Sequence, residues 1–216
     1  MSLGIILLIL TGLLIYFGVA QRVLDKLYLT DSMALFFLAL IIAGSFFDVT
    51  LIRAPLLTVN AGGALVPVVL AVYVLTRAGT GKEWIRTIIA VILTGGAIYA
   101  ISLIFHDFGH GYDLIDPTFV FAISGGIIAY ILGGSRRGSF IAGTLGFLIY
   151  DLIILWRVLT GQIVAEVRIG GAGIFDSIII SGLIAVLLAE FIGESLERIK
   201  GGHHERERGG ENGDEK

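Results

Sequence analysis

Asp151 is a single carboxylate within the apolar sequence "GFLIYDLIILW", residues 146–156. Ionising a carboxylate in hydrocarbon costs roughly 3 kcal/mol on insertion scales, so such a group needs a partner or a proton. One and two turns back on the same helical face lie Phe147, Leu148 and Thr144, none of which is a cation. We therefore expect Asp151 to be protonated, or to face an aqueous cavity or another helix. We favour a functional role, and the alternative is a hydrogen-bonded structural role.

Asp176 follows the glycine-rich sequence "IGGAGIF". A carboxylate in the first turn of a helix accepts hydrogen bonds from free amides and opposes the positive end of the helix dipole, so capping explains Asp176 without any activity. Gly171 and Gly173 permit a tight or re-entrant backbone whose amides receive an anionic group, or the close approach of another helix. Both interpretations stay open.

Polar residues and helix breakers also flank another pair of apolar runs. Asp48 closes one run, and Asn60 opens the next, "VNAGGALVPVV", which contains Pro67. Interruptions of this kind line binding cavities in membrane proteins. The alternative is a capped, kinked helix that needs no ligand. The candidate substrate-binding residues are Asp48, Asn60, Asp151, Gly171 and Gly173.

The polar segment "HDFGHGYDLIDPT" is a candidate metal site. His106 and His110 are four residues apart and share a face if the preceding helix continues, which with Asp107 gives two imidazoles and one carboxylate for zinc or another divalent ion. Glycines within the segment oppose that continuation. The alternative is a polar loop that ends at Asp116-Pro117, a signal for a helix start.

The elements that carry these residues are apolar runs of bilayer-spanning length. The chain has 216 residues, 56% of them hydrophobic, and its few charges are clustered between the runs. A soluble helix carries a polar face and these runs do not, so the sequence predicts an all-α, polytopic membrane helix bundle with about seven transmembrane helices. The expected spans are 2–20, 32–52, 61–77, 84–105, 119–134, 139–159 and 174–193.

The positions of Lys and Arg predict the orientation, because short cytoplasmic loops retain positive charge. Of the 15 basic residues, only Arg53, Arg157 and Arg168 fall on one side of the predicted spans. We therefore expect the N-terminus outside the cell and the C-terminus in the cytoplasm. Residues 1–193 form a single transmembrane domain in this interpretation, and residues 194–216, which mix both charges with glycine, form a charged, disordered cytoplasmic tail.

Four sequence blocks resemble an uncharacterised family of prokaryotic membrane proteins known as domain of unknown function 1614. They are "NAGGALVPVVLAVYVL", "DPTFVFAISGGIIAY", "GTLGFLIYDL" and "IGGAGIFDSIIISGLIAVLLAE". These blocks cover residues 60 to 190 with gaps, and the glycine-rich block before Asp176 is the most specific. The resemblance implies a prokaryotic multi-pass membrane protein and assigns no activity.

A second resemblance is to presenilin-type intramembrane aspartyl proteases, which carry Tyr-Asp on one helix and Gly-x-Gly-Asp at the start of the next. Tyr150 and Asp151 match the first motif. The second match is looser, because two residues separate Gly173 from Asp176. The resemblance implies catalytic roles for Asp151 and Asp176, since two carboxylates that share a proton can activate water.

Three classes of function follow from these patterns. The first is a small-solute or ion transport or binding protein of the cell membrane, with a polar site around Asp151 open to the outer side. The second is the aspartyl-protease-like hydrolase, and the third is a non-catalytic membrane scaffold. The expected partners are the lipid bilayer, a small solute or ion and, for transport, further copies of the chain. We expect no cofactor and no nucleic acid.

Overall fold

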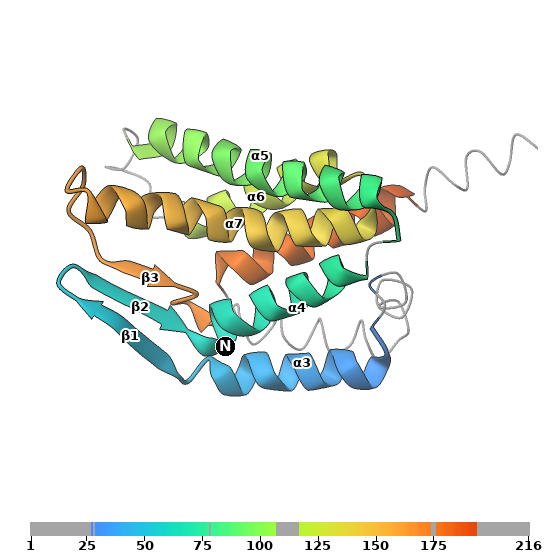
Figure 1. Ribbon diagram of the computed structural model, residues 1–216, viewed down its shortest axis with the longest axis horizontal. Helices are drawn as coiled ribbons and strands as arrows, with labels where there is room; N and C mark the ends of the chain where they lie inside the picture. The colour runs from blue at the N-terminus through green and yellow to red at the C-terminus, as the bar shows by residue number, and fades with distance from the viewer. Residues whose placement is uncertain (1–26, 28, 78, 107–116, 174–175, 194–216) are drawn as a thin grey trace, which may run out of the picture.

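Helices make up most of the part of the chain that the computed structural model describes, which is residues 27, 29–77, 79–106, 117–173 and 176–193 (Figure 1). The helices are α3 (Asp31–Gly44), α4 (Val66–Thr76), α5 (Gly81–His106), α6 (Pro117–Gly133), α7 (Arg136–Leu159) and a final helix, Ser177–Gly193. A π-helical turn, η1 (Ala61–Leu65), leads into α4. Helix α7 packs against α4, α5 and α6, so it is central to this arrangement.

A small sheet lies at one end of the helices (Figure 1). Strands β1 (Asp48–Arg53) and β2 (Leu56–Asn60) form an antiparallel hairpin, and β3 (Val167–Ile169) pairs with β2 in parallel. The sheet corrects the prediction of an all-α bundle. Hydrophobicity alone does not separate a short apolar strand from the end of an apolar helix, whereas the Val, Ile and Thr residues of these segments favour strands.

Helices occupy the predicted spans 61–77, 84–105, 119–134, 139–159 and 174–193. Within the described residues, only α5 and α7 are long and apolar enough to be candidate membrane spans, so the prediction of seven spans is not confirmed. The span predicted over 32–52 is corrected, because α3 ends at Gly44 and the chain enters β1 after a turn. The carbonyl oxygen of Ile41 accepts two hydrogen bonds from Ser45, one from its hydroxyl at 2.6 Å and one from its amide at 3.0 Å, and these bonds close the last helical turn. The predicted span 2–20 and tail 194–216 lie outside the described residues.

Small residues let α7 lie close to its neighbours. A Cβ atom added to Gly146 would lie 2.8 Å from Cβ of Thr94 on α5, and one added to Gly95 would lie 2.8 Å from the carbonyl oxygen of Gly146. A Cβ atom at Gly143 would lie 2.7 Å from the carbonyl oxygen of Ser181 in the final helix. Such contacts between small residues are typical of helix packing in membranes, because they let backbones approach closely.

Large apolar side chains cover the outer surface of the two longest helices. Ile85 and Ile92 on α5 are each 57% exposed, and Trp156 on α7 is 65% exposed. In the most apolar 18-residue window, only 33% of α5 and 44% of α7 is buried. A core helix of a soluble protein buries its apolar face. Both helices are also long and apolar enough to cross a membrane.

The close approach at Gly143 gives a prediction for stability. Gly143→Ala should lower the free energy of unfolding by about 1–3 kcal/mol, because the added methyl group meets backbone atoms that cannot rotate away. Gly96→Ala is the matched control, since nothing lies within 4 Å of its added Cβ atom and alanine favours the helix. Thermal unfolding of the purified proteins measures both. Equal melting temperatures for the two variants would contradict this packing.

Candidate functional site

A buried polar junction forms where α3, the β-hairpin and η1 meet, and Asn60 is its centre. The Asn60 side chain is 2% exposed. Its amide nitrogen donates to the carbonyl oxygen of Ser45 at 3.0 Å and to Oδ1 of Asp48 at 2.9 Å, while its Oδ1 accepts from the Gly63 amide at 2.7 Å. The hairpin register pairs Asp48 directly with Asn60. One side chain thus joins the end of α3, the first residue of β1 and the start of η1.

Four glycines let two backbone segments cross beside this junction, and we call them the glycine crossing: Gly62, Gly63, Gly170 and Gly173. A Cβ atom at Gly63 would lie 2.1 Å from the carbonyl oxygen of Gly170 and 2.9 Å from that of Gly173. One at Gly62 would lie 2.1 Å from the carbonyl oxygen of Ile41. Gly170 and Gly173 also have φ values of 72° and 61°, a backbone conformation that favours glycine. No other residue type fits these contacts.

Asp176 ends the turn that follows the glycine crossing. Its Oδ1 accepts a hydrogen bond from the Ile178 amide at 3.0 Å, and its Oδ2 accepts one from the Ala172 amide at 3.3 Å. Its own amide donates to the carbonyl oxygen of Gly173 at 3.0 Å. The side chain is 8% exposed. These are the bonds of a capping carboxylate at the start of the final helix.

Asp151 lies on α7, partly buried, and its carboxylate is close enough to that of Asp176 for the two to interact electrostatically. The neighbouring Tyr150 packs edge-on against Phe147, with ring centroids 5.4 Å apart. Within the described residues, no Lys or Arg forms an ion pair with either carboxylate. Two acids therefore share one region without a basic partner, and a proton or a bound cation there would relieve their repulsion.

The structure brings together most of the residues that the sequence singled out. Asp48, Asn60, Gly173 and Asp176 lie in or beside the junction, and Asp151 interacts with Asp176. Gly171 differs, because it is exposed and is not part of the crossing. Its nearest contacts for an added Cβ atom are atoms of Arg168 in the same turn.

The predicted metal site is not tested by these contacts. His106 ends α5, while Asp107 and His110 lie outside the described residues. Among the residues that the structure describes, no group of three or more His, Cys, Asp or Glu side chains could hold a metal ion.

Ser45 is a junction residue that sequence reasoning missed. It donates to Ile41, its carbonyl oxygen accepts from Asn60, and its Cβ and Oγ atoms lie against Gly173. The sequence "AGS" at residues 43–45 contains the signal, since a glycine followed by serine in an apolar run is a common helix break.

Comparison with known proteins shows the family. The model described as "Protein of unknown function (DUF1614)" matches residues 12–188. The chain belongs to this family. The family resemblance inferred from the sequence blocks is therefore confirmed, whereas the resemblance to presenilin-type proteases is not shown. No curated protein and no solved structure matches the chain.

The family match covers the whole candidate site. Residues 12–188 include the polar junction, the glycine crossing and both carboxylates of the Asp151 and Asp176 pair. They exclude only the end of the final helix and the charged tail on the C-terminal side. The site therefore lies in the part of the chain that defines the DUF1614 family.

The junction predicts a large cost for removing the Asn60 side chain. Asn60→Ala should lower the free energy of unfolding by about 2–4 kcal/mol, because the buried Gly63 amide and Ser45 carbonyl lose their partner. Asp48→Ala is the control. It removes one hydrogen bond, from an exposed residue to Asn60, and should lower the free energy of unfolding by about 1 kcal/mol or less. Denaturant unfolding compares the two. A cost for Asn60→Ala no greater than the control's would refute the role of this side chain.

Proposed function

We propose that this DUF1614 protein is a multi-pass integral protein of a prokaryotic cell membrane that binds and moves a small cation, or a solute coupled to protons, at the Asp151 and Asp176 pair. The membrane part rests on the exposed apolar surfaces of α5 and α7. At 1.5 Å per residue, a helix of 24 residues is roughly 36 Å long, enough to cross a hydrocarbon core of about 30 Å.

The shorter helices fit a membrane domain with interrupted spans. Helix α3 has 14 residues, which corresponds to roughly 21 Å and is too short to cross alone. The hairpin and η1 follow it directly, and the glycine crossing joins them to the turn before the final helix. Irregular backbone of this kind is tolerated at membrane depth only where protein or a water-filled cavity covers it. Substrate sites of transporters are commonly built at such helix breaks.

The charge distribution supports the predicted orientation. Arg77, Glu83 and Arg137 lie together at one end of the helices: Arg137 donates to the Arg77 carbonyl oxygen at 2.9 Å and pairs with Glu83 at 3.2 Å. The sheet lies at the opposite end, and the polar junction lies where the hairpin meets α3 and η1 (Figure 1). If the basic end faces the cytoplasm, Asp151 and Asp176 lie toward the outer side, as the small-solute or ion site requires.

The single observation that carries the binding proposal is the pair of carboxylates without a basic partner beside a helix break. A structural acid in a membrane is normally paired with a cation or with hydrogen-bond donors. Asp176 has two amide donors, whereas the Asp151 side chain forms no hydrogen bond or ion pair within the described residues. A carboxylate in that situation is suited to taking up and releasing a proton or cation.

The same two residues favour a second candidate, an intramembrane aspartyl-protease-like hydrolase. Its supporting observation is the electrostatic interaction between Asp151 and Asp176. A carboxylate dyad needs both acids, so either Asp→Asn substitution would abolish cleavage of a membrane-embedded peptide substrate. A scaffold, by contrast, predicts that both substitutions lower the amount of folded protein and change no turnover.

Single cysteines test the orientation cleanly, because the natural chain has none. Val164 is fully exposed in the segment after α7, and Gly79 lies in the turn before α5 with nothing near an added Cβ atom. In intact cells, a membrane-impermeant maleimide should label Val164→Cys, whereas Gly79→Cys should react only after permeabilisation. Labelling of both positions from the same side would overturn the proposed topology.

Proteoliposomes test the role of Asp151. With the wild-type chain, imposed Na⁺ or K⁺ gradients should drive pH-dependent proton movement, reported by a dye inside the vesicles. Asp151→Asn should reduce that movement about tenfold or more, the factor that corresponds to losing ~1.4 kcal/mol of coupling. Glu166→Gln is the control, since Glu166 is exposed and paired only with Arg168 nearby. Equal fluxes for wild type and Asp151→Asn would remove the transport proposal.

A further inference from the structure

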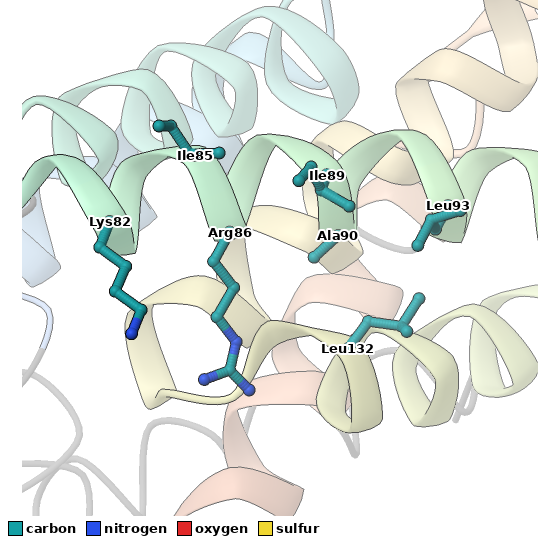
Figure 2. Close-up of a pocket in the computed structure, with 7 residues that line it drawn as sticks. All are labelled: Lys82, Ile85, Arg86, Ile89, Ala90, Leu93 and Leu132. Atoms are coloured by element: carbon teal, nitrogen blue, oxygen red, sulfur yellow. The ribbon is translucent and has the colours of Figure 1, made fainter.

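An open groove runs along the surface of α5 toward the end of α6 (Figure 2). It has a volume of about 590 Å³, within the range of about 300–1,000 Å³ that small-molecule sites usually have. Its walls are almost entirely apolar and are formed by Ile85, Ile89, Ala90, Leu93 and Leu132. Three of these side chains, Ile85, Ile89 and Leu93, are at least half exposed, so the groove faces the surroundings of the protein.

Two cations stand at one end of this apolar groove. Figure 2 shows the Lys82 and Arg86 side chains extending from successive turns of α5 toward the same side. No acidic residue lines the groove. Neither cation forms an ion pair within the described residues, and the acid next to Lys82, Glu83, is engaged by Arg137 at 3.2 Å. Both charges at the end of the groove therefore lack an acidic partner in this part of the chain.

The Arg86 guanidinium lies against the loop between α6 and α7. An added Cβ atom at Gly134 would overlap the guanidinium group, with its nearest atom 1.7 Å away, so Arg86 lies directly over this glycine. Gly134 has a φ of 66°, which favours glycine in any case. Of the two cations of the groove, Arg86 therefore lies against the backbone at Gly134, whereas Lys82 is exposed.

We propose that this groove binds an anionic phospholipid, with the phosphate between Lys82 and Arg86 and an acyl chain along the apolar wall. The inference rests on the membrane location proposed above, but not on the transport activity. An arginine binds phosphate oxygens through paired N–H donors, while a lysine acts as a mobile point charge. Basic pockets between helices at the cytoplasmic side of a membrane are suited to anionic headgroups, and the groove lies at the basic end.

The charge and the apolar wall of the groove together favour an anionic phospholipid over a free phosphate ion or a neutral lipid. A free phosphate ion would use the two cations and leave the apolar wall uncovered. A neutral lipid would cover the wall and leave both cations without an anion. An anionic phospholipid satisfies both parts, since it joins a phosphate to an acyl chain, just as the groove joins Lys82 and Arg86 to the apolar wall of Ile89 and Leu93.

Native mass spectrometry of the full chain in detergent tests the proposal. Phosphatidylglycerol and phosphatidylcholine with identical acyl chains are titrated separately, together with inorganic phosphate. Phosphatidylglycerol should bind more tightly than phosphatidylcholine. Lys82→Gln should weaken phosphatidylglycerol binding about fivefold, and the double variant with Arg86→Gln roughly 25-fold, with phosphatidylcholine binding unchanged. Arg53→Gln is the matched control, because Arg53 is an exposed basic residue at the far end, on β1.

The outcomes separate this proposal from the alternatives. Equal binding of the two lipids, or equal weakening by Arg53→Gln, would overturn it. Phosphate that competes with phosphatidylglycerol at equal concentration would show a free-anion site and would also overturn it. Thermal unfolding of each variant without lipid controls for misfolding, which is not expected because both side chains are exposed. Binding is measured without flux, so a failed transport assay leaves this test intact.

Discussion

The structure depends on one constraint. Where α3 ends, at η1 and before the final helix, the backbone N–H and C=O groups that lack a helical partner need a hydrogen bond from elsewhere in the chain. Where these groups are buried, no water can replace such a partner. Asn60 meets this need by accepting from the Gly63 amide and donating to the Ser45 carbonyl oxygen. Asp176 does the same for the Ile178 amide in the first turn of the final helix and for the Ala172 amide in the turn before it. The glycine crossing lets these two capped breaks touch, so the sheet, η1 and the final helix are held as one unit.

The charged side chains of this unit differ from those at the opposite end of the molecule in whether they form ion pairs. At the basic end, Arg136 pairs with Glu190 and Arg137 pairs with Glu83, so four charges are neutralised where loops join the helices. Asp151 and Asp176 interact electrostatically, and neither forms such an ion pair within the described residues. Ion pairs at the basic end fix the helices relative to one another. Within the described residues Asp151 is therefore the acid that is left available for a ligand, whereas the Asn60 junction and the ion pairs at the basic end both stabilise the fold.

The sequence predicted the helices well and the contacts between them poorly. Apolar runs long enough for a bilayer identify α5 and α7, because length and hydropathy are local properties. The pairing of Asp48 with Asn60 depends on the register of a hairpin that no helical pattern contains. The approach of Asp151 to Asp176 depends on the packing of α7 against the final helix, where Gly143 meets Ser181. Spacing alone therefore identified the candidate residues but could not establish which of them meet.

The most direct test of the account is whether lipid surrounds the apolar helix surfaces outside this polar unit. A nitroxide spin label at Ile92→Cys, in a chain without other cysteines, reports its collisions with oxygen and with a water-soluble nickel complex in lipid vesicles. We predict strong relaxation by oxygen and little by nickel at position 92, and the reverse at Val164→Cys. Equal access of nickel to both positions would show that α5 faces water and would contradict the account.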